Sequence, residues 1–150
     1  MIPNTTAQNM GGITALSVAL VSDIADMLSL AGSSRITYAS GKSALSAYFS
    51  HNSAQIITSK AAGNMYNIQV KFRSPNDRAA LLAAILSYVN QKVVIIATDS
   101  NGEVKVYGST KCPLILTHEP TPKGNTSDYN GVAFEASGLD FAPGRFLVTT

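Results

Sequence analysis

Apolar and polar residues alternate most regularly between residues 66 and 73. The apolar members share one face of an extended chain: Tyr66, Ile68, Val70 and Phe72. Because a period of two is that of a half-buried strand, we expect a strand here. A second β-rich run covers residues 55–59, and Gly63-Asn64 between the two runs supplies the positive φ of a tight reversal. The pattern therefore predicts a β-hairpin.

The period changes to that of a helix after Pro75. Apolar side chains recur three and four positions apart and form a single stripe: Leu81, Leu82, Ile85, Leu86 and Val89. Asn76 or Asp77 can cap the exposed N–H groups at the start of this run, and Asn90 ends it. The pattern predicts one principal helix, at about residues 76–90, whose apolar stripe packs on a sheet.

Residues 93–96 are continuously aliphatic. A run without polar alternation is typical of a central strand covered on both faces, and we expect the helix to cover one of them. Residues 99–102 contain an Asn-Gly pair, which favours a turn into a strand at residues 104–107. Later strands are expected at residues 132–136 and 145–148.

Other segments have less regular patterns. Residues 1–12 are polar and end in two glycines, which predicts a flexible N-terminal arm. Residues 13–30 fit a strand or a helix, although the acidic residues near their end favour a helix. We expect a strand at residues 35–39 and either a short strand or a helical turn at residues 43–51. Residues 119–128 are rich in Pro and Gly and are expected to form a long loop.

These elements fit one domain. A chain of 150 residues is long enough to bury about two thirds of its unfolded surface. We expect residues 13–150 to form a single α+β domain, with a mainly antiparallel, curled or sandwiched β-sheet and one principal helix packed on it.

The chain carries few charges. Charged residues make up 13% of it, about half of the usual share of roughly 25%. Because the cores of protein interfaces are depleted in charge, this composition favours self-association or a large partner. The net charge of +2 is too small to indicate a protein built to hold nucleic acid, although non-specific contact with DNA remains open.

Two short segments each match part of a known binding loop but lack one of its required residues. Gly41-Lys42-Ser43 ends like a phosphate-binding loop, yet the required earlier glycine is replaced by Ile36. The segment from Asp99 begins like a calcium loop, yet Thr110 stands where its closing glutamate is needed. We therefore interpret both motifs as turns.

Isolated reactive residues also point away from catalysis. His51 and His118 are 67 residues apart and have no metal-ligand spacing to one another. Asp23 and Asp26 fit a solvated face better than an acid–base pair. Cys112 cannot form an internal disulfide because it is the only cysteine, and we expect a small apolar residue at the entrance of a strand. We assign no catalytic, cofactor-binding or metal-binding residue, and we expect a protein that is not an enzyme.

A resemblance to a known family rests on the order of motifs between residues 63 and 149. The pieces are, in chain order, Gly63-Asn64, Tyr66, Ile68, Val70, Phe72-Arg73, Asp77-Arg78, residues 93–96, Asp99, Asn101-Gly102, Tyr107-Gly108-Ser109, Cys112-Pro113-Leu114, Leu116, Asp128-Tyr129-Asn130-Gly131, Ala142-Pro143 and Phe146. This order resembles that of small virion structural proteins of tailed bacteriophages and prophages, of the neck, head–tail joining, tail-tube or tail-terminator type.

The resemblance implies a non-enzymatic subunit of a multimeric ring or tube at the neck or tail, through which DNA passes. Its partners would be copies of itself and other virion proteins, such as portal, neck or tail subunits. It would be made in the host cytoplasm, be located in the virion, and need no cofactor.

A second function from another class remains open. A β-rich domain can also act as a monomeric or dimeric binding module that recognises a peptide or small ligand at a sheet edge. We expect neither function to involve a membrane, because the apolar run at residues 13–24 is interrupted and much shorter than the roughly 20 residues of a membrane span.

Overall fold

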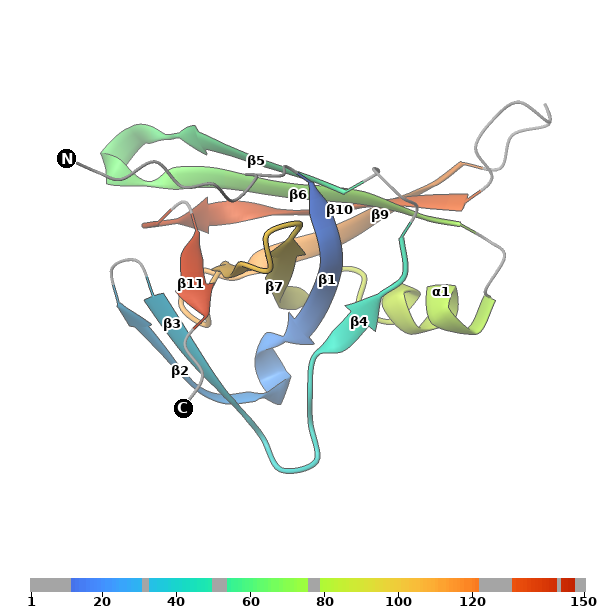
Figure 1. Cartoon of the computed structure of the whole chain (residues 1–150), viewed down its shortest axis with the longest axis horizontal. Coiled ribbons are helices and arrows are strands. Elements are labelled where there is room, and N and C mark those ends of the chain that lie inside the picture. Colours follow the sequence, from blue (N-terminus) through green and yellow to red (C-terminus); the bar gives the residue numbers. More distant parts are fainter. Residues whose placement is uncertain are drawn as a thin grey trace.

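The computed structural model describes residues 12–30, 33–49, 54–75, 79–121, 131–142 and 144–147. These residues form eleven β-strands, one α-helix and two 3-10 turns (Figure 1). The elements are β1 (Ile13–Leu20), a 3-10 turn (Val21–Asp23), β2 (Ile24–Leu30), β3 (Ser33–Tyr38), β4 (Leu45–Ala47), β5 (Gln55–Lys60), a 3-10 turn (Ala62–Asn64), β6 (Tyr66–Pro75), α1 (Ala79–Leu86), β7 (Lys92–Asp99), β8 (Val104–Tyr107), β9 (Leu114–Thr121), β10 (Gly131–Asp140) and β11 (Arg145–Leu147).

The eleven strands belong to one open, mixed sheet. Its hydrogen-bonded order is β2-β3-β11-β8-β7-β9-β10-β6-β5, and β1 pairs with β7 and with β4 beside this path. The pairing of β11 with β3 is parallel, whereas the other described pairings are antiparallel. The fold is broadly α+β as expected, but the expectation of a mainly antiparallel sheet is only partly right. A parallel pair needs a long connection, and here most of the domain lies between β3 and β11.

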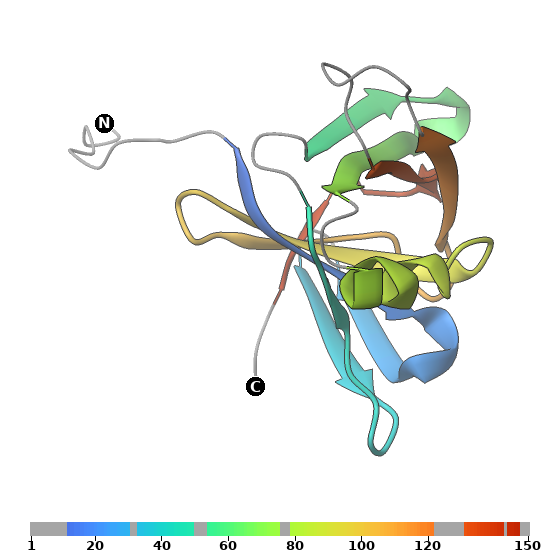
Figure 2. The ribbon, with the colours of Figure 1, turned by 90° about the vertical axis from the view of Figure 1, so that its right-hand side faces the viewer.

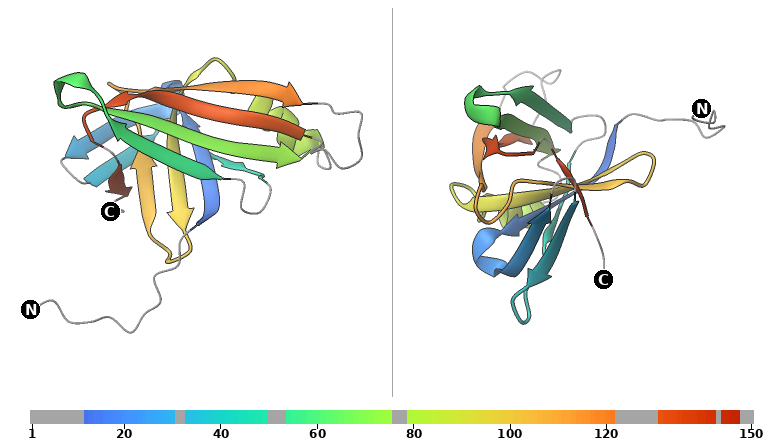
Figure 3. Two further views of the ribbon diagram at one scale, coloured as in Figure 1. Left: turned by 90° about the horizontal axis from the view of Figure 1, so that it is seen from above. Right: turned by 90° about the vertical axis from the view of Figure 1, so that its left-hand side faces the viewer.

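Bending divides this sheet into three layers. We call β5, β6, β10 and β9 the upper layer, β4, β1, β7 and β8 the middle layer, and β2 and β3 the lower layer. Strand β11 links the middle and lower layers, because it pairs with β8 and with β3. The upper and lower layers lie on opposite sides of the middle layer (Figure 2). The upper strands run across those of the middle layer, as Figure 3 shows from above. The sheet is therefore curled over itself.

Strand β9 forms the corner between the upper and middle layers. It pairs with β10 along Ile115–Thr121 and with β7 at Leu114 and Ile115. The corner is tight, because a Cβ on Gly138 of β10 would lie 2.8 Å from the carbonyl oxygen of Pro113. A glycine at that position lets the two backbones approach closely.

Strand β7 is buried on both faces, as its aliphatic run predicted. Val93 and Ile95 are fully buried in a main core between the upper and middle layers, and they share it with Ile85 of α1. Val94 is fully buried in a second core between the middle and lower layers, together with Val106 of β8. The prediction of a central strand, with the helix on one of its faces, is confirmed.

The helix has the predicted place but is shorter than predicted. It covers Ala79–Leu86, turns follow at residues 87–90, and residues 76–78 lie outside the described part of the chain. After Leu86 the backbone N–H groups of Tyr88 and Val89 donate three residues back instead of four, which tightens the last turn. The N–H of Asn90 then donates to the carbonyl of Leu116 on β9, at 2.7 Å, and the chain continues into β7. Leu81, predicted in the apolar stripe, is 39% exposed.

Residues 13–30 form two strands, so the helical preference inferred from their acidic residues is wrong. β1 pairs with β7 over its whole length and with β4 on its other side, which buries Val18 and Ala19. This tertiary pairing outweighs the weak local preference. Of the other uncertain segments, residues 35–39 lie largely in β3, and residues 43–51 contain the short strand β4.

The predicted hairpins are present. β5 pairs with β6 in a regular antiparallel register, and Gly63 and Asn64 have φ values of 75° and 61° in the turn. β7 and β8 pair around the Asn-Gly turn. The later strands are also found, although β10 is longer than predicted and β9 includes residues 119–121 of the expected loop. The rest of that loop from residue 122, and residues 1–11 of the expected arm, lie outside the described residues.

The substitution Ile85→Asp tests the anchoring of α1. Ile85 is fully buried in the main core, so a carboxylate there would lack water and a partner. We expect a loss of more than about 4 kcal/mol in the free energy of unfolding, measured by urea denaturation. Ala83→Asp on the exposed side of the same helix is the matched control and should cost less than about 1 kcal/mol. Equal effects would show that the buried face of α1 is wrongly assigned.

Candidate interaction surface beside strand β5

Strand β5 has an open edge. It is the last strand of the sheet order, and in the described part of the chain it pairs with β6 alone. Its register shows no bulge, it contains no proline, and its one charged residue is the terminal Lys60. Natural proteins usually protect such edges with charges, prolines or bulges, because an edge exposes backbone groups that can pair with another strand. The β5 edge is thus well suited to accept a further strand.

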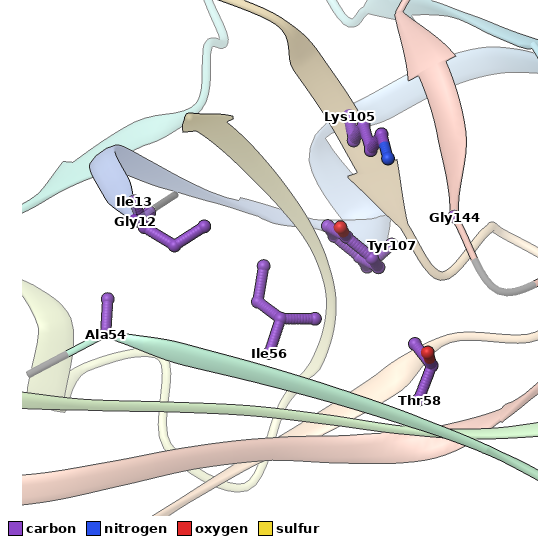
Figure 4. Close-up of a pocket in the computed structure, with 8 residues that line it drawn as sticks. All are labelled: Gly12, Ile13, Ala54, Ile56, Thr58, Lys105, Tyr107 and Gly144. Carbon is purple, nitrogen blue, oxygen red and sulfur yellow. The ribbon is translucent and has the colours of Figure 1, made fainter. Parts of the chain in front are cut away.

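A groove with a volume of about 460 Å³ lies beside this edge. Its lining comes from the start of β1, from β5, from β8 and from the residue before β11: Gly12, Ile13, Ala54, Ile56, Thr58, Lys105, Tyr107 and Gly144. Figure 4 shows the aliphatic side chains at one end of the groove and the amine and hydroxyl groups at the other. The groove therefore offers apolar contact and a few polar groups to an occupant.

Tyr107 forms one wall of the groove and is held by close packing against Gly144. A Cβ on Gly144 would lie 2.9 Å from Cε1 of the Tyr107 ring, so a side chain there would displace the ring. The pKa of the Tyr107 phenol is raised above its ordinary value of 10.0, first by burial and second by the negative charge of Asp99. The wall is therefore a neutral, well-packed aromatic ring at neutral pH.

Lys105 contributes the cationic group of the groove. Its Nζ lies 5.2 Å from the centre of the Phe146 ring, and the two residues are opposite one another in the β8–β11 pairing. This cation–π contact orients the amine beside the groove. Phe146 itself is 48% exposed and does not line the groove.

A buried ion pair fixes the chain between β10 and β11. Both terminal nitrogens of Arg145 donate to the carboxylate of Asp140, at 2.6 and 3.0 Å, and the two residues are 7% and 1% exposed. The carboxylate also accepts the backbone N–H of Phe141 at 2.7 Å. Because this geometry is bidentate, it sets the position of the connection that carries Gly144 and Phe146.

The start of β1 is tied to the tip of the β7–β8 hairpin. The carbonyl of Gly12 accepts the backbone N–H of Ser100 at 3.1 Å, and a register shift lies between Ile13 and Ala15. The Thr14 hydroxyl in this irregular step donates to the carbonyl of Thr98 at 3.2 Å. These contacts hold Gly12 and Ile13 at the rim of the groove.

The structure places the two predicted motifs in turns. Gly41 has a φ of +76° in the bend between β3 and β4, and nothing lies within 4 Å of the space that its side chain would occupy. Oδ1 of Asp99 accepts the backbone N–H groups of Asn101 and Glu103 at 2.9 and 3.0 Å, which closes the hairpin turn. The interpretation of both motifs as turns is confirmed.

The isolated reactive residues are not brought together. Asp23 ends a 3-10 turn and Asp26 lies in β2, so they do not share a helix face. His118 is exposed on β9, and His51 lies outside the described residues. Cys112 is half-buried in the turn before β9, close to the strand entrance that was expected. The described residues contain no group of three or more His, Cys, Asp or Glu side chains that could hold a metal ion.

Reasoning from the sequence missed the groove and the ion pair. The groove joins residues from distant parts of the chain, and no local pattern relates Ile13 to Thr58 or Tyr107. A signal for the ion pair did exist, because Asp140 and Arg145 are opposite charges on either side of a Pro-Gly step in a chain with few charges. Such an arrangement fits a short connection closed by a salt bridge.

No family model matches this chain, and neither a curated protein nor a solved structure matches it significantly. None of the described helices is long and apolar enough to cross a membrane.

Breaking the ion pair should destabilise the connection that carries the groove wall. Arg145→Met leaves a buried carboxylate without its partner, and we expect a loss of about 3–5 kcal/mol in the free energy of unfolding. The double variant Asp140→Leu/Arg145→Met should recover much of this loss, because neither charge remains buried. Lys71→Met on the exposed face of β6 controls for the loss of a positive charge. A double variant as unstable as the single one would contradict this account.

The raised pKa of Tyr107 predicts a pH dependence of stability. The phenol stays neutral in the folded state at a pH where the unfolded chain already loses the proton. Stability is therefore unaffected by this group below about pH 10. It falls as the pH rises from there to the pKa of Tyr107 in the folded state, because only the unfolded chain gains from losing the proton. We expect Tyr107→Phe to lose less stability than the wild-type protein between about pH 8 and about pH 11, measured by urea denaturation at each pH. Parallel curves for the two proteins would refute this assignment.

Proposed function

We propose that this protein is a non-enzymatic structural subunit that assembles with copies of itself into a ring or tube at the neck or tail of a phage-like virion. The observation that carries this proposal is the unprotected edge of β5 with the groove beside it. An edge of this kind is a binding surface for another polypeptide, because its backbone N–H and C=O groups can extend the sheet.

The ends of the sheet support contacts of the head-to-tail kind. The path begins at β2 and ends at β5, and these two strands do not pair with one another. Each has an exposed apolar side chain, Leu28 on β2 at 50% and Ile57 on β5 at 37%. A contact between two different surfaces of one subunit generates a ring when its rotation closes, or a tube or filament when it does not.

Composition and the order of motifs support the virion setting. Charged residues make up 13% of the chain, as suits a protein with much of its surface in contacts with other subunits. The resemblance to head–tail joining and tail proteins supplies the partners, namely portal, neck or tail subunits. A net charge of +2 suits a lumen that DNA passes through without being held.

The same groove favours one alternative function. A monomer could bind an extended peptide or a small ligand between β5 and the β7–β8 hairpin, with Lys105 and Tyr107 as polar contacts. A pocket of about 460 Å³ is large enough for such a ligand. This alternative requires no contact between copies of the protein.

Native mass spectrometry and light scattering of Ile57→Lys test the proposal. We expect the wild-type protein to form discrete high-order oligomers, and we expect the substitution to reduce assembly at least tenfold, because a charged residue on the edge strand opposes pairing. Ile115→Lys is the matched control, since Ile115 is 38% exposed on β9, which has neighbours on both sides. Both variants should melt like the wild-type protein.

Two results would contradict the proposal. A wild-type protein that stays monomeric at every concentration, and also in the presence of neighbouring virion proteins, would favour the binding module. Equal losses of assembly in the two variants would show that β5 is not the contact surface.

A further inference from the structure

We propose that residues 1–11 of one copy add as a strand to the free edge of β5 in a neighbouring copy and occupy the groove beside it. This inference rests on the proposed self-assembly and names the surface and the segment that would produce it. It follows from the shape of the upper layer, from the place where β1 begins, and from the sequence that precedes it.

The upper layer is too narrow to cover the middle layer completely. The β7–β8 hairpin and the start of β1 extend beyond β5 in the view of Figure 3 from above. Ile13 and Lys105 on this overhang line the groove, and Ile13 packs against the main core while remaining only partly buried. One further strand beside β5 would cover the overhang and complete the layer.

Gly12, the first described residue, lies at this groove, so the segment that precedes it joins the domain here. Gly12 is itself part of the lining, and its carbonyl is held by the backbone of Ser100 at the hairpin tip. Eleven residues precede it, which span up to about 36 Å when extended. A strand paired along the six residues of β5 needs about 20 Å, so about five residues remain to connect it to its own subunit.

The composition of the segment suits this position. Residues 4–10 contain no proline, glycine or charge, so each backbone group is able to join a ladder. They are mainly Thr, Asn, Gln and Ala, and Met10 is followed by Gly11. The uncharged side chains would enter the groove beside Lys105 without burying a second charge, which limits the cost of desolvation.

Exchange between copies, rather than folding back onto the same copy, follows from the proposed self-assembly. The five residues between the paired stretch and Gly12 are long enough for either arrangement, so the cross-links described below distinguish them. A neighbour's β5 can be reached with the remaining residues as a linker. Each subunit then donates a segment at one place and accepts one at another, which is a head-to-tail contact that can propagate around a ring.

Chemical cross-linking between single-cysteine copies tests this inference with the full chain. All variants carry Cys112→Ser, so that the only cysteines are those introduced by design. Copies with Thr6→Cys are mixed with copies with Ile57→Cys, unfolded and refolded together, and treated with a short bis-maleimide. A cross-link between the two kinds of copy can form only between subunits. We expect its yield to be at least tenfold higher than that of the control mixture, Thr6→Cys with Leu28→Cys.

Leu28 is a suitable control because it is also an exposed apolar residue on a terminal strand, at the other end of the sheet. A chain that carries both Thr6→Cys and Ile57→Cys reports folding back, since that would give a cross-link within one subunit.

The outcomes separate this inference from the proposed function. Assembly with a high yield of the Thr6–Ile57 cross-link between subunits supports both. Assembly without that cross-link overturns the inference and leaves self-assembly standing, with another segment or protein on β5. A cross-link that forms only within single chains also overturns it. A monomeric protein without any cross-link overturns the inference and the proposed function together.

Discussion

The burial of strand β7 on both faces is the constraint on which the rest of the structure depends. Val93, Val94 and Ile95 are all fully buried, although consecutive residues of a strand point to opposite faces. Burial of each such side chain contributes about 1.5–3 kcal/mol. With one helix described, the sheet must supply most of the cover itself, so it bends over β7 in both directions.

Because the sheet bends over β7 without closing, its two ends remain open. A sheet that curls into three layers without closing keeps two terminal strands, and these are β2 and β5. The lower layer needs to cover only a small core around Val94, whereas the upper layer faces the longer main core and ends at β5 before it has covered Ile13. The candidate interaction surface is thus the uncovered part of the domain's own core, which explains why it is partly apolar and adjoins a free backbone edge.

Rigid local contacts keep this surface in shape. The Asp140–Arg145 pair fixes the connection into β11, Gly144 admits the Tyr107 ring, and the Gly12 carbonyl joins the start of β1 to the hairpin tip. A buried ion pair contributes little net stability, because the cost of desolvating both charges offsets much of their attraction. Its location beside the groove suits a role in positioning. In the proposed assembly, such fixed geometry would let the surface match its partner in the same way in every copy.

Local sequence patterns by themselves determined the hairpin of β5 and β6, the central strand β7 with its turn into β8, and the presence of α1 with Ile85 inward. In each case the period of apolar residues or a Gly-Asn or Asn-Gly pair acts within a few residues, so the signal is complete in the sequence. Only the tertiary structure decided that residues 13–30 are strands, that the helix ends at Leu86, and that β11 runs parallel to β3. Those outcomes depend on pairing partners that are distant in the sequence, such as Phe146 and Ser33 in the β11–β3 pair. The candidate site shows the same division: β5 could be predicted as a strand, but its open edge and its groove exist only because distant strands stop short of covering it.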